Sequence, residues 1–101
     1  MPDLKGQVAL ITGGAMGIGK AIALKLAESG AGIVIADVAV DAAKETAKEI
    51  EALGVKAAAF GLDVSNAENV KKVIESACGE FGRLDILINN AYPRNKNYGR
   101  K

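Results

Sequence analysis

Short apolar runs alternate with longer amphipathic stretches along most of the chain. The runs lie at residues 8–11, 33–36, 55–62 and 84–88, and each is flanked by glycine, aspartate or asparagine within two residues. Runs of this length between turn-forming residues favour buried strands over helices. The run at residues 55–62 is the weakest of the four, because alanines fill it. The pattern therefore predicts four strands.

The three stretches between these runs have the periodicity of helices. Residues 17–29 place apolar side chains at every fourth position, and residues 41–53 and 66–81 do so at spacings of three and four. The positions are, in turn, Ile18, Ile22 and Leu26; Ala43, Ala47 and Ile50; and Val70, Val73, Ile74, Ala77 and Phe81. Asp41 is expected to cap the second helix, and Ser65 and Glu68 to form a capping box for the third.

Strand and helix therefore alternate as β-α-β-α-β-α-β. Alternation of this kind predicts parallel strands joined by right-handed helical crossovers on both faces of a sheet. The expected fold is Rossmann-type α/β, a three-layer α/β/α arrangement with four parallel strands in the order 3-2-1-4, which is an incomplete doubly wound fold. We assign residues 1–91 to a dinucleotide-binding half-domain. Residues 92–101 lack apolar periodicity and are expected to form a basic loop or disordered tail.

Composition narrows the functional classes only a little. The chain has 101 residues, a net charge of +1, one cysteine and no histidine. No apolar run reaches the length of a membrane span, and a cytoplasmic setting is expected. Four basic residues and no acid lie in the last eight positions, so one alternative is a nucleic-acid or partner-binding module that uses this tail. A solvated tail is the commoner outcome, and we do not favour this alternative.

Four glycines lie in the stretch ITGGAMGIGKA, between the first strand and the first helix. In a parallel sheet this junction brings free backbone N–H groups and the positive helix end to one edge, where a phosphate can bind. Gly13 suits the tight turn, Gly17 suits close approach of a diphosphate, and Gly19 lets the helix pack on the strand. The context predicts a dinucleotide site rather than a flexible glycine-rich loop.

Asp37 follows the second strand, at the position where a carboxylate can accept hydrogen bonds from the adenosine ribose. Its charge would also repel a 2′-phosphate, and neither Met16 nor Val38 supplies a cation for that phosphate. Lys20 is the nearest basic residue and is expected to point elsewhere. We therefore expect NAD in preference to NADP. The alternative role of Asp37 is to cap its own loop.

Three motifs resemble those of the short-chain dehydrogenase/reductase family. TGGAMGIG resembles the family's TGxxxGIG, Asn89-Asn90-Ala91 resembles NNAG, and Leu62-Asp63-Val64 falls where the family has an acid and an apolar residue beside the adenine. Asp63 could also cap the following helix. Tyr92 replaces the last glycine of NNAG, which puts contacts beyond Ala91 in doubt. The expected cofactor-binding residues are Gly13, Ala15, Met16, Gly17, Ile18, Gly19, Asp37, Val38, Asp63, Val64, Asn90 and Ala91.

The resemblance implies hydride transfer by a serine, a helical Tyr-x-x-x-Lys pair and an asparagine, all beyond Ala91. Tyr92 and Lys96 match the pair literally, but Pro93 disfavours helical geometry at Tyr92, so we reject the match. Cys78 is expected to pack in the third helix. We assign no catalytic residue and no metal site, and expect the isolated chain to be catalytically incomplete, the cofactor-binding portion of an oxidoreductase. Its fourth strand would be an exposed edge that favours a homo-oligomer.

Overall fold

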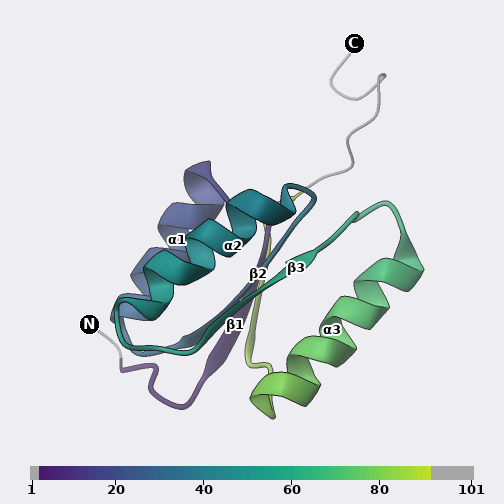
Figure 1. Cartoon of the computed structure of the whole chain (residues 1–101). Helices are drawn as coiled ribbons and strands as arrows, with labels where there is room; N and C mark the ends of the chain where they lie inside the picture. The colour runs from purple at the N-terminus through teal and green to yellow at the C-terminus, as the bar shows by residue number, and fades with distance from the viewer. Residues whose placement is uncertain (1–2, 92–101) are drawn as a thin grey trace.

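A computed structural model describes residues 3–91. Four parallel strands form one sheet in the order β3-β2-β1-β4, which confirms the predicted topology (Figure 1). The strands are β1 Val8–Thr12, β2 Gly32–Asp37, β3 Ala57–Gly61 and β4 Ile86–Asn89; the helices are α1 Gly17–Glu28, α2 Val40–Glu51 and α3 Ala67–Phe81. In the register of the sheet, Leu10 lies between Val34 and Leu87.

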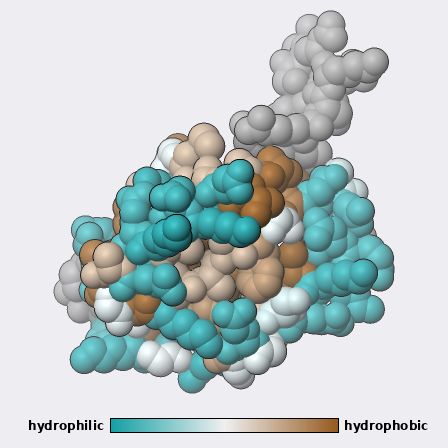
Figure 2. Space-filling view, in the orientation of Figure 1, coloured by the Kyte–Doolittle hydropathy of each residue, from teal (hydrophilic) through white to brown (hydrophobic). Residues whose placement is uncertain are grey.

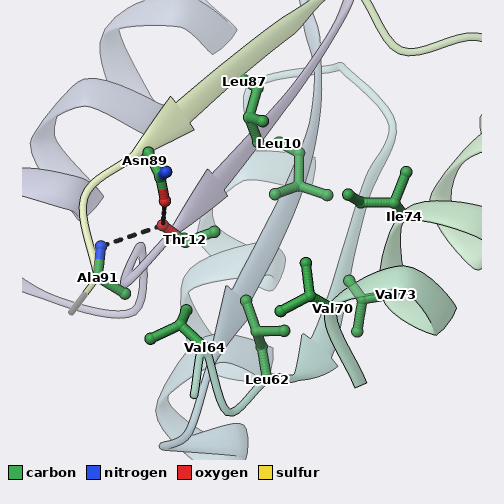
Figure 3. Close-up of a pocket in the computed structure, with 10 residues that line it drawn as sticks. All are labelled: Leu10, Thr12, Leu62, Val64, Val70, Val73, Ile74, Leu87, Asn89 and Ala91. Carbon is green, nitrogen blue, oxygen red and sulfur yellow. Dashed lines mark hydrogen bonds between the residues drawn. The ribbon is translucent and has the colours of Figure 1, made fainter. Parts of the chain in front are cut away.

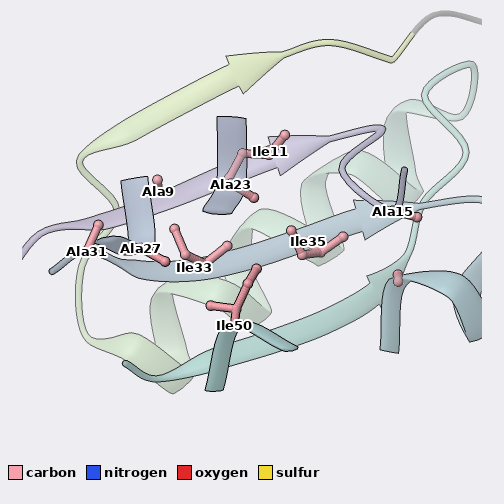
Figure 4. Close-up of a cluster of buried hydrophobic side chains, with 10 residues drawn as sticks. Ala9, Ile11, Ala15, Ala23, Ala27, Ala31, Ile33, Ile35 and Ile50 are labelled. Atoms are coloured by element: carbon pink, nitrogen blue, oxygen red, sulfur yellow. The ribbon is translucent and has the colours of Figure 1, made fainter. Parts of the chain in front are cut away.

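Helices α1 and α2 cover one face of the sheet, and α3 covers the other (Figure 1). The first face is packed with alanine and isoleucine. Figure 4 shows Ala23 and Ala27 of α1 and Ile50 of α2 directed at Ile33 and its neighbours on β1 and β2. On the second face, Val8, Leu10, Val34, Ala36 and Leu62 of the sheet side pack with Val73 and Ala77 of α3. Both faces of the central strands are buried, which explains their continuous apolar runs.

The buried side of α1 differs from the prediction. Gly19, Ala23 and Ala27 face the sheet, while Ile18 is 74% exposed and Ile22 and Leu26 are half-buried. The cause is the turn before the helix, which holds Gly19 against the Gly13 carbonyl oxygen. That contact fixes the rotation of the helix, and positions four and eight residues later then face the sheet as well. Small side chains at these positions let α1 lie close to the strands.

The helix caps also differ from the prediction. Helix α2 begins at Val40 with Ala39 at the N-cap, so Asp41 lies inside the first turn. Asn66, rather than Ser65, caps α3, and its side-chain oxygen accepts a hydrogen bond from the Asn69 N–H at 3.0 Å. The expected capping box with Glu68 is therefore wrong, because the helix starts one residue later than the motif requires.

Strand β4 begins two residues later than the sequence indicates. Asp85 explains the delay, because its carboxylate accepts a hydrogen bond from the Val8 N–H at 2.8 Å while its own N–H donates to the Val8 carbonyl at 2.9 Å. Arg83 pairs with the same carboxylate at 2.8 Å and holds the pKa of Asp85 below its ordinary value. The short segment before β4 thus anchors the beginning of β1.

The two outer strands of the sheet leave apolar surface open. Figure 2 shows weakly hydrophobic surface over β3, between the hydrophilic outer sides of α2 and α3. On β4, at the other edge, Leu87 is 53% exposed. Cys78 is exposed on α3, which corrects the expectation that it packs, because Val73 and Ala77 form the inner side of that helix.

None of the helices within residues 3–91 is long and apolar enough to cross a membrane. The predicted basic segment at residues 92–101 lies outside the described residues, and so does the Tyr92–Lys96 match. The alternative function that used this segment rests on the sequence alone.

Candidate dinucleotide-binding site

The glycine turn, residues 13–16, connects the end of β1 to the start of α1 at Gly17. The Gly13 N–H donates to the Ala36 carbonyl at 2.7 Å, so the turn begins by crossing over to β2. Gly13 has a φ of +68°, and a Cβ there would lie 3.0 Å from Asn90 Nδ2 and 3.2 Å from Ala91 Cα. Both the left-handed backbone and this close approach require glycine. The turn is therefore pressed against the segment that follows β4.

The other two motif glycines lie at the start of α1 and have different surroundings. Gly17 has a φ of +62°, and a Cβ on it would meet no atom within 4 Å. A Cβ on Gly19 would overlap the Gly13 carbonyl oxygen, so Gly19 allows the helix to pack on the turn itself rather than on the strand. Gly17 thus presents bare backbone to open space, whereas Gly19 makes the compact turn possible.

The N-terminus of α1 has no side-chain partner in the described part of the chain. Met16 is the N-cap residue, it makes no side-chain capping bond, and the first turn contains no acidic residue. The N–H groups at the start of a helix need an acceptor from outside the helix. Together with the positive end of the helix dipole, these free donors suit an anion such as a diphosphate.

The segment Asn89–Ala91 is bound to the turn through Thr12. Its buried hydroxyl accepts hydrogen bonds from the Asn90 N–H at 2.9 Å and the Ala91 N–H at 3.0 Å. The Asn89 side-chain oxygen lies 3.4 Å from the same hydroxyl (Figure 3). The Asn90 side chain donates to the Gly13 carbonyl at 3.1 Å. The C-terminal ends of β1 and β4 are therefore held together beside the glycine turn.

Asp37 lies at the end of β2, next to the same turn. One carboxylate oxygen accepts from the Ala15 N–H at 3.1 Å, and the other accepts from the Ala39 N–H at 3.0 Å. The side chain thus braces its own loop, as the alternative reading of the sequence suggested, and also braces the glycine turn. Each oxygen can accept a further hydrogen bond. Because Asp37 is only partly buried, a ribose hydroxyl could reach it.

Within residues 3–91, Met16, Val38 and Lys20 supply no free positive charge beside the Asp37 carboxylate. Met16 and Val38 are 57% and 54% exposed, and both are apolar. Lys20 is directed away to α2, where it forms an ion pair with Glu49 at 2.9 Å. This agrees with the expectation that Lys20 points elsewhere.

Thr46 contacts the turn from α2, and sequence reasoning missed it. Its hydroxyl donates to the Ala15 carbonyl at 2.8 Å, and the residue is 1% exposed. The available signal was a polar residue beside Ala43, Ala47 and Ile50, on the apolar side of the second helix. A buried hydroxyl at such a position needs a hydrogen-bond partner, and here that partner is the Ala15 carbonyl in the turn.

Asp63 and Val64 lie farther along the same sheet edge, after β3. The Ser65 hydroxyl and N–H both donate to the Asp63 carboxylate, which lowers the pKa of Asp63 below its ordinary value. The Asp63 N–H in turn donates to the Asn69 side chain at 2.7 Å. Asp63 therefore takes part in the start of α3, which was the second role considered for it. No hydrogen bond within residues 3–91 connects it to the glycine turn.

A groove of about 330 Å³ lies between α3 and the face of the sheet that this helix covers. Its lining is mainly apolar, and Figure 3 shows Val70, Val73 and Ile74 of α3 facing Leu10 and Leu87 of the sheet. Val64 and Ala91 also line it, but residues 13–19 do not. The groove has few hydrogen-bond donors for a phosphate, so the glycine turn rather than this groove is the candidate phosphate site.

The sequence of the chain matches the family of short chain dehydrogenases over residues 7–97. The chain belongs to the short chain dehydrogenase family. Members of this family are oxidoreductases with a Rossmann fold, and the sheet order described above is theirs.

Individual relatives in the short chain dehydrogenase family agree with this assignment. The 3-oxoacyl-[acyl-carrier-protein] reductase FabG of Thermotoga maritima is 40% identical over 88 residues, which are 87% of this chain and 36% of the relative. NAD⁺-bound xylitol dehydrogenase superposes with a TM-score of 0.85 at 36% identity, covering 87% of this chain and 34% of that one. A short chain dehydrogenase from Mycobacterium paratuberculosis bound to NAD gives 0.83 at 34% identity, covering 88% and 38%. The chain thus spans about a third of the length of the relatives it matches.

Proposed function

We propose that the chain holds the nicotinamide dinucleotide of a short chain dehydrogenase. The diphosphate binds at residues 13–19, where the backbone N–H groups of Met16, Gly17 and Ile18 lie at the open start of α1. The single observation that supports this most strongly is that start: a helix N-terminus with a left-handed glycine, no cap and no acid. Two NAD-bound neighbours of the same fold add independent support.

The remaining contacts follow from the positions of the other edge residues. We assign the adenosine ribose to Asp37, the adenine to Val38, Asp63 and Val64, and the inner part of the dinucleotide to Asn90 and Ala91. Gly13, Ala15 and Gly19 act by shaping the turn: the two glycines approach Asn90 and backbone closely, and Ala15 is bound by the side chains of Asp37 and Thr46. When bound, a nicotinamide dinucleotide supplies hydride transfer.

NAD is the preferred form of the cofactor in this proposal. A 2′-phosphate would face the Asp37 carboxylate, and the neighbouring exposed residues Met16 and Val38 are apolar. The nearest lysine, Lys20, is paired with Glu49. Two negative groups in contact without a cation disfavour NADP.

Calorimetric titration of the whole chain with NAD and with NADP tests the proposal. We expect weak but saturable binding of NAD, and at least a tenfold weaker response to NADP, equivalent to about 1.4 kcal/mol. A heat signal that stays flat up to millimolar NAD would refute it.

Asp37→Ala separates the ribose assignment from simple bracing of the turn. Loss of the hydrogen bond to Ala15 should weaken the binding of NAD and NADP alike, whereas loss of the negative charge removes a repulsion that acts only on NADP. The ratio of the NAD affinity to the NADP affinity should therefore fall toward one. Asp41→Asn is the matched control, because it removes an exposed carboxylate from the first turn of α2 at the same sheet edge. The ratio in that variant should equal that of the parent chain.

We further infer that the 101 residues alone bind the cofactor without catalysing hydride transfer. The Thr12 hydroxyl is bound to the segment after β4, and Lys20 is paired with Glu49, so neither is free to exchange a proton with a substrate. With saturating NAD and a panel of simple alcohols, the absorbance of reduced nicotinamide should not change. A steady rise in that absorbance would contradict the inference.

The edge of β4 is also proposed to pair with a second copy of the chain. Leu87 of this edge strand lies on the α3 face and is half exposed, and an unpaired apolar strand edge favours pairing with another strand. Analytical ultracentrifugation should detect dimers or larger species, and Leu87→Lys should shift the population to monomer. A monomer at the highest soluble concentration of the parent chain would dispose of this pairing.

A further inference from the structure

Thr46 and Asp37 hold the Ala15 residue of the glycine turn from two different elements. Thr46 of α2 donates its hydroxyl to the Ala15 carbonyl at 2.8 Å, and Asp37 at the end of β2 accepts from the Ala15 N–H at 3.1 Å. Ala15 itself is buried, at 4% exposure. The backbone polar groups on both sides of this residue are therefore fixed by side chains that lie 31 and 22 positions away in the sequence.

The bond to Thr46 determines the direction of a donor in the phosphate site. The Ala15 carbonyl and the Met16 N–H belong to one trans peptide unit, in which the C=O and N–H bonds point in opposite directions. Because the carbonyl points inward to α2, the Met16 N–H must point outward, away from that helix. Met16 is the N-cap of α1, so this N–H is the first in the row of free donors at the start of the helix.

We propose that Thr46 is a positioning residue for the diphosphate of the dinucleotide. The inference rests on the proposed function: Thr46 is buried and does not touch the ligand, but it keeps the Ala15–Met16 peptide in the orientation that the phosphate requires. Without the hydroxyl the peptide can rotate, and only a fraction of molecules then presents the donor. The apparent affinity falls in proportion to that fraction.

A purely structural role predicts a different result. Thr46 lies on the same side of α2 as Ala43, Ala47 and Ile50, so its loss must also lower the free energy of unfolding. If stability were its whole contribution, the folded molecules would bind the dinucleotide as well as the parent chain does. Binding per folded molecule therefore distinguishes the two roles.

The experiment compares variants of the full chain by calorimetry with NAD, at a temperature where each is folded. Thr46→Val keeps the shape and removes the donor, and we expect its Kd for NAD to rise about fivefold, as the loss of one hydrogen bond in the turn implies. Thr46→Ser keeps the hydroxyl and should restore the parent affinity. Ile50→Val is the matched control, because it also weakens the buried side of α2 but makes no hydrogen bond to the turn.

Adenosine supplies the second readout, since it has no phosphates. Ligand-observed NMR should give the same adenosine affinity for Thr46→Val and for the parent chain. An equal loss of affinity for adenosine and NAD would overturn the proposal, and so would an unchanged NAD affinity in Thr46→Val. If that variant does not fold, Thr46→Ala removes the same donor with a residue of higher helix propensity and must show the same loss for NAD.

Failure of the proposed function gives a different outcome from failure of this inference. If the parent chain itself does not bind NAD, both proposals fall. If the parent chain binds NAD and Thr46→Val or Thr46→Ala binds it equally well, only the positioning role of Thr46 falls.

Discussion

Helices α1 and α3 both start at the same edge of the sheet, each just after a strand, but their first turns are built in opposite ways. At α3 the Asn66 side chain caps the helix, Asn69 binds the Asp63 N–H, and Ser65 binds the Asp63 carboxylate. At α1 the N-cap is Met16, which makes no side-chain capping bond, and the first turn has no acid. The polar groups at the start of α3 are bound by nearby side chains, whereas those at the start of α1 have no side-chain acceptor within residues 3–91.

The difference concerns stability as well as ligand binding. A good side-chain cap contributes about 1 kcal/mol to a helix, and α1 does without one. The turn before α1 is nevertheless well fixed, because the side chains of Asp37, Thr46 and Asn90 bind its backbone from three different parts of the chain. The site is therefore rigid where its shape is set and open where an anion would bind, which is the condition for a preorganised site.

The largest effect is expected for Gly19→Ala in α1, with Gly79→Ala in α3 as the comparison. Gly19→Ala places a Cβ against the Gly13 carbonyl, so it should lower the free energy of unfolding by about 3 kcal/mol, at the upper end of overpacking costs, and abolish NAD binding. Gly79→Ala in α3 meets no atom within 4 Å and should instead stabilise the chain by about 0.5–1 kcal/mol. Urea unfolding measures both changes, and a neutral or stabilising Gly19→Ala would show that α1 is not packed as described.

A new cap on α1 should increase stability and reduce binding. Met16 has the extended backbone of an N-cap, so the carboxylate of Met16→Asp can accept from the free N–H groups and raise the free energy of unfolding by about 0.5–1 kcal/mol. The same carboxylate occupies and repels the diphosphate site, and the affinity for NAD should drop by more than about tenfold, or 1.4 kcal/mol.

Met16→Asn tests how much of that loss comes from charge. It caps the helix without a negative charge, so it should keep most of the gain in stability and lose less affinity than Met16→Asp. Improved binding of NAD in either variant would show that the free donors of α1 do not contact the phosphates.

Removal of the Asn66 cap on α3 should lower the stability of the chain and leave NAD binding unchanged. Asn66→Ala deprives the Asn69 N–H of its partner, and the free energy of unfolding should fall by about 1 kcal/mol. Because this cap serves the helix alone, NAD affinity per folded molecule should equal that of the parent chain. A marked loss of affinity at full folding would mean that the start of α3 also belongs to the binding site.

The smallest effect is expected from acid. Ser65 lowers the pKa of Asp63, mainly through its hydroxyl, so the ionised carboxylate is favoured in the folded chain. The resulting stabilisation is fully present above the unfolded pKa of about 3.9 and is lost as the pH falls through the lower folded value. Ser65→Ala should move the pKa of Asp63 back toward its ordinary value, as carboxyl NMR titration can measure. An unchanged or lower pKa in the variant would contradict the bond between these residues.

The sequence was enough to predict the order of the elements, and it pointed to the glycine turn as the candidate site. Continuous apolar runs on β1 and β2, the glycines after β1 and the acid after β2 are local features, and each predicts its structure without knowledge of the rest of the chain. The topology then follows from the handedness of the crossovers. The same local features led to the dinucleotide hypothesis.

The tertiary structure decided which side of each element is used and what fixes the turn. Periodicity favoured Ile18, Ile22 and Leu26 as the inner side of α1, but contact between Gly19 and the Gly13 carbonyl turned the helix by one position. Thr46 could be recognised as a turn-holding residue only when α2 was packed beside the turn. A periodic pattern predicts that a helix has an apolar and a polar side. The rotation of that helix and its long-range hydrogen bonds depend on backbone from elsewhere in the chain.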